Sequence, residues 1–202
     1  MRGLIANKML ANNKVIKALT LTDFAVWSGS SLIATIFPLF VITQIEGATV
    51  THAGISSMIY MIVPAILNMP FGKLLDKMKG YNDELNMLTW SNVIRGISLI
   101  ALAFTTNLWV FFLLQALLGA AKSMNTTSWR VLFSRFLDTE HLGREWSIYD
   151  TVMSVGLGIA AYLGGFLGEN WGFQIVVLIG GIMSLIGAIF PLFTSEQIND
   201  LK

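Results

Sequence analysis

The residues of this sequence that could do chemistry are polar side chains set inside long apolar runs. Asp23, Trp27 and Ser31 follow one another at intervals of four residues, so in a helix they share one face. Gln115 and Lys122, seven residues apart, share a face in the same way. An ionisable group in an apolar run usually faces a cavity or a partner, so both faces are candidates for contact with a ligand. The alternative is that Asp23 and Lys122 lie near helix ends, extend to water and bind nothing specific.

Arg95 is a different case, because it lies ten residues into an apolar run. A cation at that depth reaches water poorly, and we expect it to have a carboxylate or carbonyl partner inside the protein. Asp23 and Asp150 are the candidate carboxylates. The interpretation we favour for Arg95 and Asp150 is a buried structural ion pair rather than a functional role.

Other kinds of chemistry lack the residues they need. The sequence contains no Cys and two His, which excludes disulfides, thiol catalysis and a metal site built from Cys or His. It has no Gly-x-Ser-x-Gly, no His-Glu-x-x-His and no Gly-x-x-x-x-Gly-Lys-Ser/Thr motif. The net charge is +1, and no basic run is dense enough for nucleic acid. We therefore expect neither an enzyme nor a cofactor, a metal ion or a nucleic-acid partner.

The composition indicates which solvent surrounds the elements that carry these residues. Hydrophobic residues make up 54% of the chain and charged residues 12%, about half the charged share of a soluble domain. The mean hydropathy of +0.67 agrees, so lipid must solvate much of the protein. A bilayer core of roughly 30 Å needs about 20 apolar residues per helix. We therefore predict an all-α integral membrane protein with six transmembrane helices, at residues 21–45, 53–71, 85–104, 108–126, 148–167 and 173–193.

The positions of Lys and Arg predict how the helices are oriented. Of the 13 cations, Arg95 and Lys122 lie within spans, whereas the others precede the first span or follow the second, fourth and sixth. Because cytosolic segments carry the excess of Lys and Arg, we expect both termini in the cytosol of a multi-pass plasma-membrane protein. Residues 1–19 would form a basic cytosolic leader, either an interfacial helix or a frayed segment. Residues 20–194 would form the membrane domain and residues 195–202 a cytosolic tail.

The fifth predicted helix carries small residues at regular intervals. Gly156, Ala160, Gly164 and Gly168 repeat every four residues, so they form a groove on one face of the helix. Small residues let two helices in a membrane approach closely. We therefore predict that this groove is a helix-packing surface.

The segment after the second span resembles a known family motif. It reads Gly-Lys-Leu-Leu-Asp-Lys from Gly72 to Lys77. This resembles the G-x-L-a-D-R/K-x-G-R/K loop between the second and third helices of the major facilitator superfamily, with Asp76 at the motif aspartate. The glycines of the fifth span also resemble the G-x-x-x-G-P-x-x-G-G pattern of antiporter members, although Ala160 and Ala161 replace its Gly-Pro pair.

The resemblance covers about residues 20–194, which is one six-helix half of a fold that normally has two. It implies a parallel homodimer, with a central cavity between two copies lined by the first and fourth helices of each. Asp23, Trp27, Ser31, Gln115 and Lys122 would then line the path of a small solute through a half-size secondary transporter. The fourth span has Gln115 where the family often begins an R-x-x-Q-G motif. A non-transporting membrane scaffold or partner subunit that keeps the fold is therefore the alternative.

The family fold also implies how two copies would meet. Gly72, Asp76 and Lys77 would form a gating loop, with Asp76 near the start of the partner's fifth helix, around residues 145–148. The unpaired N–H groups at that helix start favour a carboxylate by about 0.3–1 kcal/mol. The small-residue groove of the same helix would then receive the partner's second helix.

Overall fold

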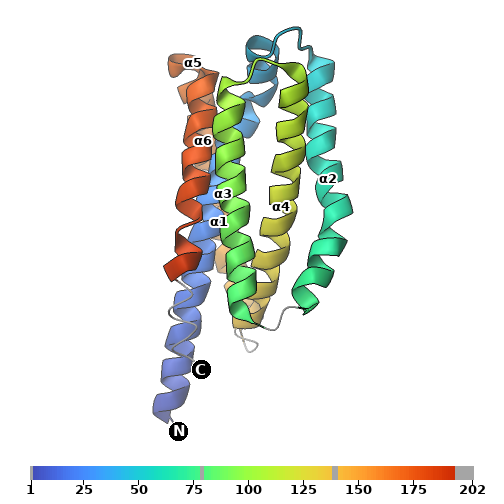
Figure 1. Cartoon of the computed structure of the whole chain (residues 1–202). Coiled ribbons are helices and arrows are strands. Elements are labelled where there is room, and N and C mark those ends of the chain that lie inside the picture. The colour runs from blue at the N-terminus through green and yellow to red at the C-terminus, as the bar shows by residue number, and fades with distance from the viewer. Residues whose placement is uncertain (1, 78–79, 138–140, 194–202) are drawn as a thin grey trace.

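In the described part of the chain, six α-helices stand side by side (Figure 1). The computed structural model describes residues 2–77, 80–137 and 141–193, with side chains from residue 14 onward. No strand occurs within these ranges. The helices are α1 (Arg2–Gln44), α2 (Val50–Lys77), α3 (Tyr81–Phe104), α4 (Leu108–Phe136), α5 (Leu142–Trp171) and α6 (Phe173–Gly187).

Each of the six predicted spans holds a helix, and the described segments around them are long and apolar enough to cross a bilayer. The sixth differs from the prediction, because α6 ends at Gly187 and a turn follows before residue 193. Several helices extend beyond the predicted apolar runs. α2 continues to Lys77, α4 continues to Phe136, and α5 already begins at Leu142. The length of an apolar run reflects only the thickness of the bilayer core that the helix crosses. Lys, Arg and Glu are themselves good helix formers, so a helix can continue past the end of its apolar run.

The predicted leader is not a separate segment, because α1 runs without a break from Arg2 to Gln44. Val15 and Leu19 are fully buried. The indole N–H of Trp129 donates a hydrogen bond to the Leu19 carbonyl oxygen at 3.1 Å. The membrane bundle therefore begins before residue 20, since the four-residue spacing of Val15 and Leu19 turns an apolar face toward α3 and α4. The predicted tail, residues 195–202, lies outside the described residues.

The helices alternate in direction and form two similar groups of three. α1 begins and α6 ends at the lower end of the bundle in Figure 1, while the α1–α2, α3–α4 and α5–α6 connections lie at the upper end. α1 packs against α5 and α6 in the way that α4 packs against α2 and α3, and α3 packs against α6. Exchanging α1–α3 with α4–α6 maps these contacts onto one another. Because α1 and α4 run in opposite directions, the two groups form an inverted repeat.

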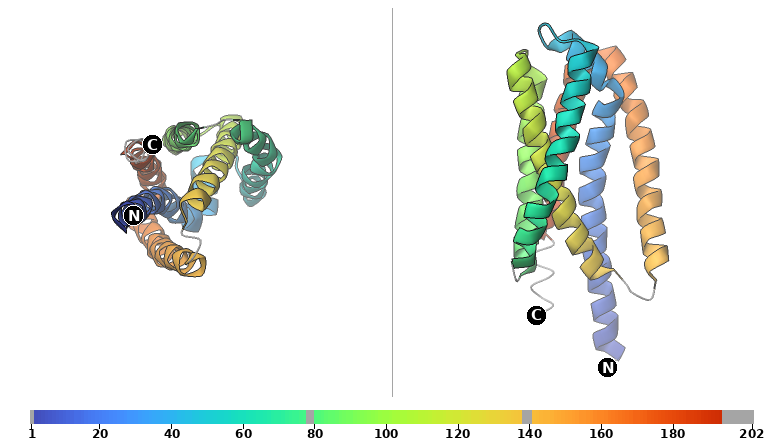
Figure 2. Two further views of the ribbon diagram at one scale, coloured as in Figure 1. Left: turned by 90° about the horizontal axis from the view of Figure 1, so that it is seen from below. Right: turned by 90° about the vertical axis from the view of Figure 1, so that its right-hand side faces the viewer.

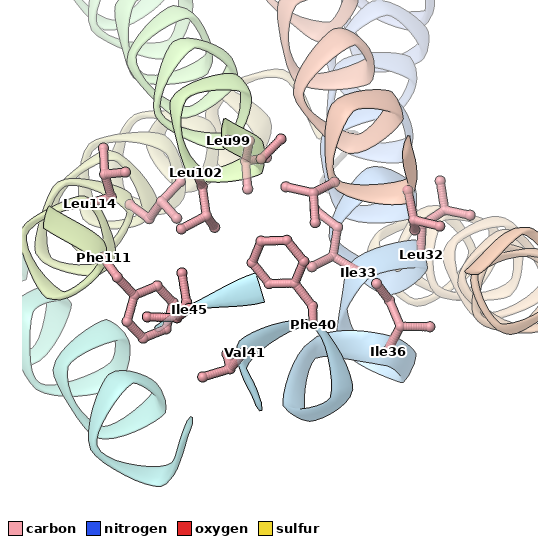
Figure 3. Packing of buried hydrophobic residues seen from close by; sticks show 14 of the residues in the cluster. Leu32, Ile33, Ile36, Phe40, Val41, Ile45, Leu99, Leu102, Phe111 and Leu114 are labelled. Atoms are coloured by element: carbon pink, nitrogen blue, oxygen red, sulfur yellow. The ribbon is translucent and has the colours of Figure 1, made fainter. Parts of the chain in front are cut away.

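Two apolar clusters hold the helices together. The upper cluster joins α1, α3, α4 and α6, and Figure 3 shows Phe40, Leu99 and Leu102 pointing into the same space within it. The lower cluster joins α1, α3 and α4 around Trp129 and Phe133, whose rings stack with centroids 4.4 Å apart. The buried polar side chains lie mainly between these two clusters, so the bundle has a polar middle layer.

Glycines allow the closest helix contacts. A Cβ atom added at Gly164 would lie 2.1 Å from the backbone carbonyl oxygen of Leu32, and one added at Gly156 would lie 2.0 Å from the Phe24 ring. The small-residue groove of α5 therefore packs against α1 of the same chain. The expectation that it receives the partner's second helix is wrong, because the space is already filled.

α2 and α5 lie at the periphery of the bundle (Figure 2). The most apolar stretch of α2 is 17% buried and that of α5 is 28% buried, whereas the corresponding stretches of the other four helices are 44–56% buried. These two helices therefore present most of their apolar surface to whatever surrounds the bundle.

Candidate functional site

A cavity of about 490 Å³ lies inside the bundle, and the upper apolar cluster contributes Ile33, Leu99, Leu102 and Leu118 to its wall. It is lined mainly by α1, α2, α3 and α4, and α5 contributes Leu157. Its polar and aromatic lining residues include Trp27, Ser31, Tyr60, Arg95, Gln115 and Lys122.

Helical periodicity explains why these side chains meet. In α4, Gln115, Leu118 and Lys122 line the cavity at spacings of three and four residues, so they form one stripe of the helix. In α3, Arg95, Leu99 and Leu102 form a second stripe in the same way. α1 contributes a third stripe from Trp27 to Pro38. Four of the five predicted cavity residues, Trp27, Ser31, Gln115 and Lys122, lie in this lining.

Asp23 is the exception among the predicted cavity residues. It is 3% exposed and does not line the cavity. One carboxylate oxygen accepts a hydrogen bond from the Trp27 indole N–H at 2.8 Å, and the other accepts one from the Tyr149 hydroxyl at 2.5 Å. Asp23 therefore links α1 to α5, and its expected place in the solute path is wrong because both of its oxygens are already occupied.

Arg95 lies in the cavity wall rather than in an ion pair. Its guanidinium donates hydrogen bonds to the hydroxyl oxygens of Tyr60, at 3.3 Å, and Ser30, and it lies over the Trp27 ring, 5.5 Å from the centroid. Within the described residues, neither Asp23 nor Asp150 forms an ion pair with it. Asp23 acts on Arg95 only at longer range, and Asp150 is exposed on α5. The predicted ion pair is wrong. Hydroxyl groups of α1 and α2 lie within hydrogen-bonding distance of the Arg95 guanidinium, whereas neither carboxylate does.

Lys122 contributes the second positive charge of the cavity. Its ammonium nitrogen lies 4.6 Å from the centroid of the Tyr60 ring and 3.3 Å from the sulfur of Met61. The ring face attracts the cation, and the thioether is a weak acceptor, but neither carries a compensating charge. The Tyr60 hydroxyl oxygen accepts a hydrogen bond from Arg95, and the face of the Tyr60 ring contacts the Lys122 ammonium group. Tyr60 therefore connects the two cations.

The predicted gating residues lie at the lower end of α2. Asp76 and Lys77 are exposed in its last turn, and Gly72 has open space around its Cα. Lys77 and Lys73 line a second, smaller hollow of about 360 Å³. No contact of Asp76 with another helix is seen in the described part of the chain, so its predicted role concerns a second copy.

Sequence reasoning missed several buried polar residues. Tyr60 could have been found from the sequence, because it follows Ser57 by three residues within an apolar span and the two polar side chains therefore share a helix face. The Asn125 amide donates to the Asn92 side-chain oxygen at 2.8 Å, across α3 and α4. The Glu84–Arg135 ion pair, at 2.7 Å, connects the same two helices, and Glu84 is fully buried. Glu84 and Arg135 lie just outside the apolar runs, where the sequence alone predicts that charged side chains are exposed to water.

These features define a class of protein before any comparison is made. A six-helix membrane bundle with an inverted three-helix repeat and a cavity with polar residues in its wall has the architecture of one half of a secondary transporter. Within the described residues no group of His, Asp or Glu side chains is arranged to hold a metal ion.

The comparisons identify the family. The sequence profile of the Major Facilitator Superfamily matches residues 19–199, and the chain belongs to this family. The Major Facilitator Superfamily is a family of membrane transporters rather than of enzymes.

Two relatives show how much of such a protein this chain represents. It is 20% identical over 185 residues to an uncharacterised MFS-type transporter of Methanocaldococcus jannaschii, covering 92% of this chain and 46% of the relative. The in meso crystal structure of the POT family transporter PepTSo is similar with a TM-score of 0.71 and 13% identity, covering 91% of this chain and 37% of that chain. This chain therefore spans about half the length of its curated relative, and the likeness to PepTSo concerns the fold alone.

Proposed function

We propose that this chain is a secondary transporter of a small solute, and that it works as a parallel homodimer with the solute path between the two copies. The proposal rests on one observation, the cavity lined by α1–α4 with Arg95 and Lys122 in its wall. Charged side chains near the middle of membrane spans usually mark a substrate or ion pathway. In transporters with repeated halves, the substrate site lies near the bilayer midplane where the repeats meet.

The exposed surface of the chain supports pairing with a second six-helix unit. α2 and α5 expose large apolar side chains, among them Met61 at 59% and Ile148 at 54%. Met61 lies both on this surface and in the cavity lining. A second copy placed against α2 and α5 would therefore cover apolar surface and close the cavity at the same time.

The predicted gate is part of this proposal. Asp76 is exposed at the lower end of α2, and α5 begins at the same end with Leu142. The backbone N–H groups at the start of a helix attract a nearby carboxylate. Contact between Asp76 and the partner's α5 would stabilise the closed state by about 0.3–1 kcal/mol, which is small enough to be reversible.

Cysteine cross-linking tests the arrangement of the two copies. The chain has no native Cys, so the background is clean. We would introduce Leu74→Cys and Ile148→Cys on separately tagged copies, because these side chains are 43% and 54% exposed. Leu75 is unsuitable, since it is 2% exposed and faces the inside of the bundle. We expect oxidation in membranes to join the two tags, and Leu75→Cys paired with Ile148→Cys serves as the matched control that should not cross-link.

Flux into proteoliposomes tests transport. We expect solute uptake by wild-type protein, strongly reduced uptake by Lys122→Ala, and normal uptake by Lys73→Ala, because Lys73 lies outside the cavity. Cross-linked, folded protein without flux across a broad solute panel would contradict the transport proposal and favour the scaffold alternative. Flux by a protein that never cross-links at several neighbouring pairs would contradict the homodimer.

A further inference from the structure

Among the described residues that line the cavity, two carry a positive charge and none carries a negative charge. Arg95 and Lys122 are in its lining, and no Asp or Glu is among the described residues that form it. Asp23 lies outside this lining, and its two oxygens are engaged by Trp27 and Tyr149. The cavity wall therefore has an excess of positive charge.

The unpaired polar groups of the cavity are hydrogen-bond donors. Arg95 is 5% exposed, and its Nε–H is buried without a partner although both terminal nitrogens are bonded. Gln115 is 3% exposed, and its side-chain nitrogen is likewise buried without a partner. Roughly 90% or more of buried polar groups in proteins are paired, so two unpaired donors in one cavity wall indicate that an acceptor belongs there.

The existing partners of the two cations leave room for such an acceptor. Arg95 is held by neutral hydroxyl oxygens, and Lys122 contacts an aromatic face and a thioether. Oxygens of an anion would form stronger, charge-assisted hydrogen bonds with both. Tyr60 keeps its own hydroxyl proton free for the same acceptor, because its oxygen accepts from Arg95.

The rest of the wall is apolar. Phe37, Met61, Leu99, Leu102, Leu118 and Leu157 line the cavity together with the polar group. Its volume of about 490 Å³ falls in the range of roughly 300–1,000 Å³ that is usual for small-molecule sites. An occupant must therefore combine an anionic head with an apolar body.

We propose that the cavity binds a small organic anion, with its negatively charged oxygens at Arg95, Lys122 and Gln115 and its apolar part against the leucines of α3 and α4. The inference deepens the proposed function, because it names the class of solute. It does not depend on transport, since binding to the cavity can be measured in the absence of a membrane.

Equilibrium binding to the purified full chain in a mild detergent tests the charge preference. Benzoate, phenyl phosphate, benzylamine and benzyl alcohol share one ring and differ in the charge of the head group. We expect saturable binding of benzoate or phenyl phosphate, and binding at least about tenfold weaker for benzylamine and benzyl alcohol, as the loss of one charge-assisted hydrogen bond implies. Equal binding of the amine or the alcohol, or no saturable binding of either anion, would overturn the proposal.

Matched variants place the bound anion. Lys122→Gln should weaken anion binding at least about tenfold, because it removes one charge from a partly exposed position without emptying a core site. Lys73→Gln removes an exposed charge outside the cavity and should leave anion binding unchanged. Arg95→Lys keeps the charge but lacks the Nε–H donor, and should bind more weakly than wild type if it folds. Unchanged binding in Lys122→Gln would overturn the assignment to this cavity, whereas anion binding without flux would count only against the transport proposal.

Discussion

At the scale of single residues, the buried polar groups of the middle layer divide into two kinds. Asp23 has both carboxylate oxygens satisfied within the chain, whereas Arg95 lines the cavity and keeps an unpaired Nε–H donor. A buried polar group without a partner needs an explanation, and for one in a cavity wall a bound ligand is the explanation we propose. The carboxylate that looked functional is therefore structural, and the arginine that looked structural belongs to the candidate site.

The first prediction concerns the link between α1 and α5. Asp23→Asn should destabilise the folded bundle by about 1–3 kcal/mol, because the amide cannot accept from both Trp27 and Tyr149 as the carboxylate does. Tyr149→Phe removes the same bond from the other side and should cost a similar amount. The free energy of unfolding, measured by titration with SDS, checks both values.

The double variant provides the control for this prediction. If the two residues act through one hydrogen bond, Asp23→Asn combined with Tyr149→Phe should cost less than the two single changes added together. Anion binding should be retained in the Tyr149→Phe protein that remains folded. Full stability together with lost anion binding would show that Asp23 and Tyr149 belong to the cavity after all.

At the scale of helices, close packing decides which glycines are indispensable. Gly164 faces the backbone of α1, whereas Gly158, six residues earlier in the same helix, has no atom near its missing side chain. Backbone atoms cannot rotate away as a side chain can, so the first position is intolerant of added volume. The four-residue repeat of small residues in the sequence includes Gly164 but not Gly158.

The second prediction follows from this contrast. Gly164→Ala should destabilise the protein by at least about 1–3 kcal/mol, because α5 must move away from Leu32. Gly158→Ala should be neutral or slightly stabilising, since Ala is the better helix former and the position is open. Folded yield in membranes and SDS titration measure the difference. Equal tolerance at the two positions would mean that α1 and α5 are not packed as described.

At the scale of the whole molecule, the described cations outside the cavity gather toward one end of the bundle. Lys73, Lys77, Arg130 and Arg135 all lie toward the lower ends of their helices, where α1 begins. The upper connections carry Glu46 and Thr106, with the Glu46 N–H donating to the Thr106 carbonyl oxygen at 2.9 Å. Because the excess of Lys and Arg stays in the cytosol, we propose that the lower end is cytosolic.

The third prediction tests this orientation by cysteine labelling. A membrane-impermeant maleimide added to intact cells should label Thr106→Cys, whose position is exposed at the upper end. Lys77→Cys should be labelled only after permeabilisation, and the Cys-free wild type gives no background. The opposite pattern would place the lower end outside and remove the proposed cytosolic gate at Asp76.

The helices of this protein follow directly from local chemistry in the sequence. Long apolar runs need lipid and internal backbone hydrogen bonds, so the existence and order of six helices could be predicted from the chain alone. The stripe of Gln115 and Lys122 could be predicted as well, because both residues lie on one helix and their relation depends only on its period. The motif around Asp76 sufficed to indicate the family.

Relations between helices could not be read in this way. Whether Arg95 meets Asp23, Asp150 or Tyr60 depends on the rotation and depth of four separate helices, and residue spacing within one helix carries no information on either. The same holds for the groove of Gly156 and Gly164, whose neighbour could have been any helix with a matching face until packing placed α1 there. Apolar periodicity identifies the buried face of a helix, but the partner of each buried polar group is chosen by the packing of the whole bundle.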